Sequence, residues 1–171
     1  MPASSRRVIA LTAGLCLLLG AVAQAADPSL PLRKAGLWEL STTMDEGLGP
    51  KDQTLTMCID ADMERTTAAA SADEHTKQCS KYSISRQGES TVVDMACQFA
   101  SRHVASRTEM SGDFEKTFEV KIESTTSGEH NQQTVSVKRT IIQKGKYLGE
   151  SCGDLAGGEA KGADGATILV Q

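Results

Sequence analysis

Two cysteines placed equally far from a glycine turn constrain the fold of this chain more than any other feature. Cys79 and Cys97 flank Gly88 symmetrically, and apolar residues alternate with polar ones on both arms of the segment 81–99. Alternation around turn-forming residues predicts a β-hairpin. In an antiparallel hairpin centred on Gly88 the two cysteines face each other, at a separation that suits a disulfide.

The first 25 residues carry the three-part pattern of a secretory signal peptide. Arg6 and Arg7 form the basic start, an apolar run covers residues 8–22, and Ala25 ends the small-residue cleavage site. The apolar run is too short and wrongly flanked for a membrane anchor, and Cys16 within it is interpreted as apolar filler. We therefore expect an exported, periplasmic protein that does not span the membrane. An ordinary signal is favoured over a twin-arginine signal.

Removal of this leader leaves four cysteines, an even number in a chain bound for an oxidising compartment. If Cys79 pairs with Cys97, Cys58 pairs with Cys152 by elimination. The competing interpretation is a metal held by four thiolates. It is weak because the chain has no CxxC or HxxxH spacing and its three histidines are scattered. The sequence thus predicts two disulfides and no metal site.

Periodicity predicts about eight strands and one short helix in a single domain, residues 26–152. Strands are expected at 37–44, 54–59, both arms of 81–99, 102–110, 114–126, 134–142 and 144–148. Asp60 is the expected N-cap of the helix in 60–77, packed over an end of the sheet. The glycine-rich segment 153–171 is expected to be a mobile tail outside the core, whose apolar end is able to pin back onto an exposed edge.

The expected fold class is all-β: a mainly antiparallel meander with one short helix. An open meander of this length leaves long exposed edges, so closure into a barrel or a strongly curved half-barrel is favoured. The strands contain many small apolar, Thr and Ser residues. This composition leaves open whether the interior is filled or hollow.

The segment that opens the first strand resembles a known family. Lys34, Gly36, Trp38 and Glu39 match the K/R-x-G-x-W-E opening of domain of unknown function family 3617, a group of small exported bacterial proteins. Further matches are Met57-Cys58-Ile59-Asp60, Cys79, Cys97, Ser111-Gly112-Asp113-Phe114 and Gly149-Glu150-Ser151-Cys152. The resemblance implies export, a β-rich fold and two disulfides, and it carries no catalytic residue. Relatives often have a Met-rich stretch where this chain has Ala and Thr, which argues against methionine-based copper handling.

The chain lacks the motifs of the common enzyme classes. It has no GxSxG, no glycine-rich phosphate loop and no HExxH. The remaining candidates are paired acids, a strand histidine, three methionines able to bind a soft metal, and an aromatic platform. They are Asp45 with Glu46, Asp60 with Asp62, His103, Met57, Met95, Met110 and Trp38. For each of them a structural role is favoured, namely capping, solvation or core packing; Lys138-Arg139 and Lys144 to Lys146 are interpreted as a solvated face.

Composition excludes one further class and leaves two functions open. The chain has 18 basic and 22 acidic residues with 4% aromatics, so it lacks the charge and the stacking platforms of a nucleic-acid binder. We expect a noncatalytic, cofactor-free monomer that binds a small apolar or amphipathic ligand in a β-barrel mouth. The alternative is a structural or interaction protein of the cell envelope with a filled core. The sequence does not identify ligand-binding residues.

Overall fold

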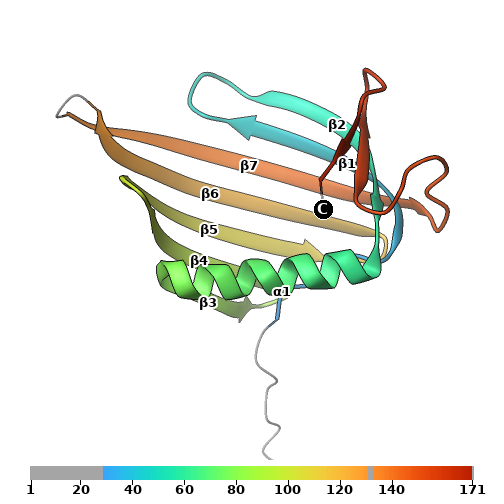
Figure 1. Cartoon of the computed structure of the whole chain (residues 1–171), viewed down its shortest axis with the longest axis horizontal. Helices are drawn as coiled ribbons and strands as arrows, with labels where there is room; N and C mark the ends of the chain where they lie inside the picture. Colours follow the sequence, from blue (N-terminus) through green and yellow to red (C-terminus); the bar gives the residue numbers. More distant parts are fainter. Residues whose placement is uncertain (1–28, 131–132, 171) are drawn as a thin grey trace, which may run out of the picture.

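Among the residues that the structure describes, nine strands form one antiparallel sheet that curves around one helix (Figure 1). The computed structural model describes residues 29–130 and 133–170, and the predicted signal peptide lies outside them. The elements are β1 (Gly36–Asp45), β2 (Lys51–Ile59), α1 (Ala61–Gln78), β3 (Cys79–Gln87), β4 (Ser90–Phe99), β5 (Arg102–Gly112), β6 (Thr117–His130), β7 (Gln133–Gly149), β8 (Glu159–Gly162) and β9 (Thr167–Leu169).

The strand order is β3-β4-β5-β6-β7-β1-β2-β8-β9. From β3 to β7 each strand pairs with its successor, as the predicted meander requires. The β1–β2 hairpin then adds to β7, so β1 lies inside the sheet and not at its edge. The sheet is not closed, because β3 and β9 are its two edges. Of the two predicted shapes, the open and curved half-barrel fits this arrangement.

The two faces of the sheet differ in polarity because side chains alternate along each strand. Residues directly opposite each other in neighbouring strands share a face, so Trp38 lies beside Met57 on one side and Tyr147 on the other. We call this apolar, concave side the inner face. Its buried members are Trp38, Leu40, Met57, Ile59, Phe118 and Ala160, and Phe114 from the β5–β6 turn packs with them. Charged residues such as Glu119, Lys121 and Lys144 occupy the outer face.

Aromatic rings close one end of the inner face. Trp38 is fully buried, contacts Phe118 and Tyr147, and donates its Nε1–H to the carbonyl oxygen of Lys34 at 2.8 Å. Phe118 lies over Gly145, where any Cβ would overlap its ring. Phe114, at a φ of 57°, stacks on Phe118 with the ring centroids 5.3 Å apart. Trp38 is therefore the core anchor that the sequence suggested.

Helix α1 lies in front of strands β3 to β5 on the inner side, roughly along their direction (Figure 1). The side chain of Asp60 caps it by accepting hydrogen bonds from the N–H groups of Asp62 and Met63. The N-cap is thus where the sequence placed it. The helix itself has 18 residues, so it covers nearly the whole predicted segment 60–77 and is not the short helix expected within it.

Both disulfides join the cysteines that the sequence paired. The sulfur atoms are 2.00 Å apart in Cys79–Cys97 and 1.97 Å apart in Cys58–Cys152. The reason for the first pair differs from the prediction, because Gln87 pairs with Ser90 and the hairpin register is one residue away from the register centred on Gly88. A β-bulge between Cys79 and Lys81 restores the cysteines to opposite positions.

The segment after Cys152 is not a tail outside the core, so the predicted domain boundary is too early. Strand β8 pairs with β2, and β9 pairs with β8 at the edge of the sheet. Ala160 is fully buried opposite Met57. A glycine-rich stretch contributes to this core because a single small inward residue suffices, and the Cys58–Cys152 disulfide holds the stretch beside β2.

Candidate functional site

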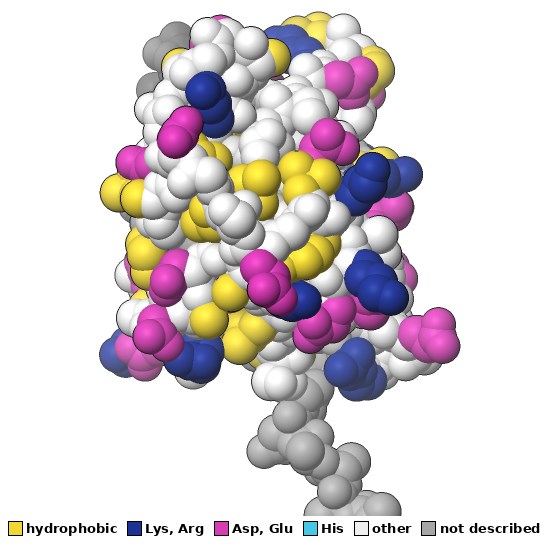
Figure 2. Space-filling model, turned by 90° about the vertical axis from the view of Figure 1, so that its right-hand side faces the viewer, with side chains coloured by type: hydrophobic (Ala, Val, Ile, Leu, Met, Phe, Trp, Pro, Cys, Tyr) yellow, Lys and Arg dark blue, Asp and Glu magenta, His cyan; other side chains and the backbone are white. Residues whose placement is uncertain are grey.

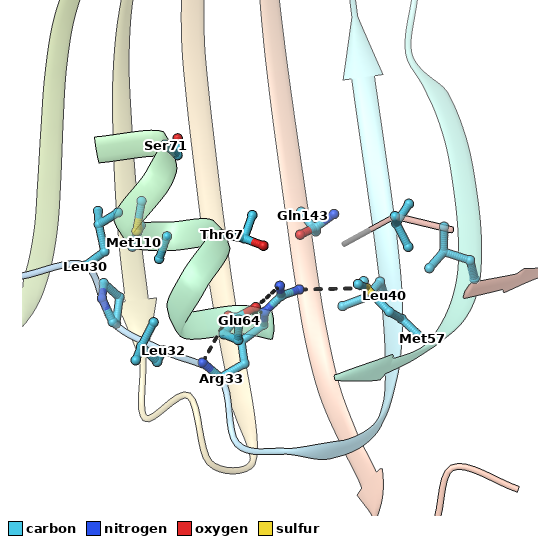
Figure 3. Close-up of a pocket in the computed structure, with 14 residues that line it drawn as sticks. Leu30, Leu32, Arg33, Leu40, Met57, Glu64, Thr67, Ser71, Met110 and Gln143 are labelled. Atoms are coloured by element: carbon cyan, nitrogen blue, oxygen red, sulfur yellow. Dashed lines mark hydrogen bonds and ion pairs between the residues drawn. The ribbon is translucent and has the colours of Figure 1, made fainter. Parts of the chain in front are cut away.

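A cavity of about 440 Å³ lies between α1 and the inner face of the sheet (Figure 3). We call it the helix cavity. Its walls come from four parts of the chain: the segment before β1, the inner side of α1, strands β1, β2, β5 and β7, and Val170 after β9. The lining residues are Leu30, Pro31, Leu32, Arg33, Leu40, Leu55, Met57, Glu64, Thr67, Ala68, Ser71, Met110, Gln143 and Val170.

The helix cavity is present because α1 presents no large apolar side chain to this part of the sheet. A helix that packs on a sheet usually presents an apolar stripe to it. The helix residues that line this cavity are Glu64, Thr67, Ala68 and Ser71, which are small or polar. The sheet residues opposite them are mostly large and apolar, among them Leu40, Leu55, Met57 and Met110. The helix cavity is therefore apolar on the side of the sheet and more polar on the side of α1.

An ion pair between Arg33 and Glu64 lies at one side of the helix cavity (Figure 3). The guanidinium Nε and Nη2 donate to the two carboxylate oxygens at 2.8 and 2.6 Å, which makes the pair bidentate. The backbone N–H of Arg33 also donates to Glu64, at 3.3 Å, and Nη1 lies 4.0 Å from the sulfur of Met57. The side chains are only 20% and 11% exposed. This pair fixes the segment before β1 to the first turns of α1.

Other polar groups around the helix cavity are hydrogen-bonded to each other. Ser71 Oγ lies 3.2 Å from His75 Nδ1, and the His75 ring stacks on Tyr82 with centroids 5.6 Å apart. Partial burial raises the pKa of Tyr82 above its ordinary value. On the opposite wall, Gln143 Nε2 donates to Thr42 Oγ1 at 3.2 Å. These groups can orient a bound molecule with hydrogen bonds while the apolar walls contact its hydrocarbon part.

The paired acids considered from the sequence have structural roles. Asp60 caps α1, and Asp62 forms an ion pair with Arg65 on the exposed side of the same helix. Asp45 accepts a hydrogen bond from the N–H of Gly47, and Glu46 forms an ion pair with Arg139. None of these four acids lines the helix cavity. Each pair is therefore accounted for by a turn, a cap or a surface contact.

The candidate metal ligands are spread over the sheet. Met57 and Met110 line the helix cavity and Met95 does not, while His103 is exposed on β5. Within residues 29–130 and 133–170, no three His, Cys, Asp or Glu side chains are grouped so that they could hold a metal ion. The two methionines contribute polarizable apolar surface to the cavity wall.

Sequence reasoning missed the Arg33–Glu64 pair and the cavity beside it. Glu64 lies in the first turns of α1, where acidic residues are common because they interact favourably with the helix dipole. Arg33 lies 31 positions earlier in an extended segment, and no spacing rule joins two such positions. The one available signal was the lack of an apolar stripe in residues 60–77, which contain few large apolar side chains. The absence of large apolar side chains on this side of α1 explains the helix cavity.

Comparison with known proteins identifies a family and no individual relative. The family model described as "Protein of unknown function (DUF3617)" matches residues 33–152. No curated protein and no solved structure matches the chain. In the part of the chain that the structure describes, no helix is long and apolar enough to cross a membrane.

Proposed function

The chain belongs to the family of proteins of unknown function DUF3617, and from that premise we propose that it binds a small amphipathic molecule in the helix cavity without catalysing a reaction. One observation carries the proposal: a cavity of about 440 Å³ separates α1 from an apolar sheet face. This volume falls in the range of roughly 300–1,000 Å³ that is typical of small-molecule sites.

The chemistry of the wall supports an amphipathic ligand. Hydrocarbon contacts come from Leu40, Leu55 and Met110, whereas Thr67 and Gln143 offer hydrogen bonds from opposite sides. Figure 3 shows the side chains of Thr67 and Gln143 reaching into the space between α1 and the strands. An apolar ligand body with one or two polar groups would satisfy both kinds of wall.

The proposed location is the periplasm, after removal of residues 1–25. The two disulfides are consistent with an oxidising, extracellular compartment. The basic start, apolar run and small-residue site of the leader support the same route. A ligand of this kind would then be a molecule that is present at, or crosses, the cell envelope.

An apolar reporter dye tests the proposal. N-phenyl-naphthylamine should bind the folded protein with a stoichiometry near one, measured by fluorescence. Ala68→Phe fills the helix cavity and should weaken dye binding by about tenfold or more, which corresponds to roughly 1.4 kcal/mol. Ala70→Phe is the matched control, because Ala70 is exposed on the opposite side of α1. Equal binding by the two variants, or no binding by the native protein, contradicts the proposal.

A second function, interaction with another envelope protein, is favoured by one observation. The edge strand β9 exposes Ile168 and Leu169, which are 50% and 71% accessible. Seen from the end of the molecule that carries β8 and β9, hydrophobic side chains gather in the middle with charged ones around them (Figure 2). If the dye does not bind, and a partner captured from envelope extracts is lost in Leu169→Lys, this second function replaces the first.

A further inference from the structure

A second cavity lies at the other end of the inner face. It measures about 660 Å³, and we call it the open cavity. Its lining residues are Glu46, Ser101, Arg102, Thr126, Ser127, Gly128, Glu129, Val135, Val137 and Arg139. It lies where β6 ends and β7 begins, next to Glu46 in the loop that follows β1.

The two cavities share one face of the sheet. Along β7, the residues at positions 135, 137, 139, 141 and 143 alternate to the inner face without a break in register. Val137 and Arg139 line the open cavity, and Gln143 lines the helix cavity. Between them lies Ile141, which pairs with Ile122 on β6. A single inward residue of β7 therefore separates the two sites.

The combined length suits a long, unbranched ligand. From Gln143 to Val135 the strand rises by about 26 Å at ~3.3 Å per residue. One acyl chain fills one leaflet of a bilayer core, which is about 15 Å, half of the ~30 Å thickness. The inner face is thus about 11 Å longer than one such acyl chain, and the head group together with the extended side chain of Arg102 spans the difference.

The two ends differ in exposure, which gives the ligand a direction. Leu40 and Met57 in the helix cavity are 3% and 4% exposed, whereas Val135 and Val137 at the open cavity are 48% and 43% exposed. The enclosed end therefore suits a hydrocarbon tail. The open end suits the part of the ligand that stays in contact with water.

Charges at the open end favour an anionic head group. Four charged residues line that cavity: Glu46, Arg102, Glu129 and Arg139. Arg139 and Glu46 form an ion pair with each other. Glu129 pairs with Thr134 at an outward position of the hairpin. Arg102 lies at an inward position beside Gly128, and among the described residues no carboxylate forms an ion pair with it. In the helix cavity, by contrast, the guanidinium of Arg33 is already held by Glu64.

We propose that the inner face binds one long-chain fatty acid, with its tail under α1 and its carboxylate at Arg102. This inference rests on the proposed function and specifies its ligand. The chain crosses Ile122 and Ile141 on its way from one cavity to the other. No covalent chemistry is involved.

Chain length and a blocking residue test the path of the tail. Binding of octanoate and palmitate to the mature protein is measured by isothermal titration calorimetry. Palmitate should bind more tightly, by about two- to fourfold for each methylene that is buried. Ile141→Trp should remove this advantage and leave octanoate binding intact, which also shows that the variant is folded. Ile142→Trp is the matched control, because Ile142 neighbours Ile141 and points to the outer face.

A charge substitution tests the position of the head group. Arg102→Gln should weaken palmitate binding by about two- to fivefold, the range expected for a partly exposed ion pair. Binding of hexadecanol, which has no charge, should stay the same. Arg65→Gln is the control, since Arg65 is exposed on the outer side of α1. An equal effect of Arg102→Gln on both ligands overturns the proposed head-group site.

The outcomes separate this inference from the proposed function. If the dye and octanoate bind but palmitate binds no more tightly, the fatty-acid path is wrong and the helix cavity remains a ligand site. If neither the dye nor the fatty acids bind, both proposals fail. If Ile141→Trp instead dissociates a homodimer, the open face is covered by a second copy of the chain, and the fatty-acid proposal is also overturned.

Discussion

The ring of Phe118 occupies the space that a side chain at position 145 would take, so one glycine allows the aromatic cluster to close the end of the inner face. Trp38 and Phe114 both pack on this ring. The alternating pattern of β6 correctly indicated an inward Phe118. It could not indicate Gly145, because the contact joins two strands whose register is set by the whole β6–β7 hairpin.

The substitution Gly145→Ala tests this contact. The added methyl group would overlap the Phe118 ring, so we expect a loss of about 1–3 kcal/mol in the free energy of unfolding, as for other overpacked cores. Urea denaturation followed by tryptophan fluorescence measures it. Gly149→Ala is the control on the same strand, because no atom lies within 4 Å of a Cβ built there. If both variants unfold at the same urea concentration, the close packing of Phe118 on Gly145 is wrong.

Most elements were visible in the sequence, and the exceptions have specific physical causes. The sequence divided residues 134–148 into two strands, whereas β7 runs unbroken from Gln133 to Gly149. The apolar alternation fails at Gln143 and Gly145, yet both residues point inward. Thr42 accepts the hydrogen bond of Gln143, and the Phe118 ring covers Gly145. An inner face can hold a hydrogen-bonded polar residue or a glycine covered by an aromatic ring. Such residues interrupt the apolar alternation from which a strand is predicted.

The turn between β5 and β6 depends on one carboxylate. Asp113 Oδ1 accepts hydrogen bonds from the backbone N–H groups of Glu115, Lys116 and Thr117, at 3.0, 2.8 and 3.0 Å. These bonds to the charged form lower the pKa of Asp113 below its ordinary value of 3.8. The turn holds Phe114, which packs into the core, so the charge state of this exposed side chain affects a buried contact.

A lowered pKa in the folded state makes stability depend on pH. The contribution of the Asp113 carboxylate is fully present above pH 3.8 and is lost as the pH falls below that value through the folded-state pKa. We therefore expect Asp113→Asn to be less stable than the native protein near neutral pH and to approach it in strongly acidic solution. Urea midpoints measured across this pH range provide the test. A constant difference at all pH values would show that the carboxylate charge does not stabilise the turn.

At the scale of the whole molecule, the curvature of the sheet and the order of its strands follow from long-range contacts. The alternation of apolar and polar residues predicted an antiparallel meander and a curved sheet. It left open whether that sheet is a barrel or a half-barrel. It did not reveal that β1 pairs with β7 or that β8 adds to β2, because those pairs are far apart in the sequence. The helix cavity depends on the same long-range assembly. Its walls were therefore beyond sequence reasoning, although a structural role was correctly favoured for two of the residues that form them, Met57 and Met110.

The two disulfides should contribute unequally to global stability. Cys58–Cys152 spans 94 positions and Cys79–Cys97 spans 18. In the chain-entropy model, loss of the first costs about 4–5 kcal/mol and loss of the second about 3 kcal/mol. The double variants Cys58→Ser/Cys152→Ser and Cys79→Ser/Cys97→Ser, compared by thermal and urea denaturation, test this order. Titration of the unfolded, unreduced mature protein should find no free thiol, and two or four reactive thiols would contradict the pairing.

Val170 completes one wall of the helix cavity, and its N–H donates to the carbonyl oxygen of Gly158 at 2.9 Å. The stretch shared with the family ends at Cys152. A fragment trimmed to residues 33–152 would keep both disulfides and the aromatic cluster, but it would lose Leu30, Pro31, Leu32 and Val170 from the walls of the helix cavity. Both ends of the mature chain therefore lie close to the helix cavity, and a purification tag at either end is removed before binding is measured.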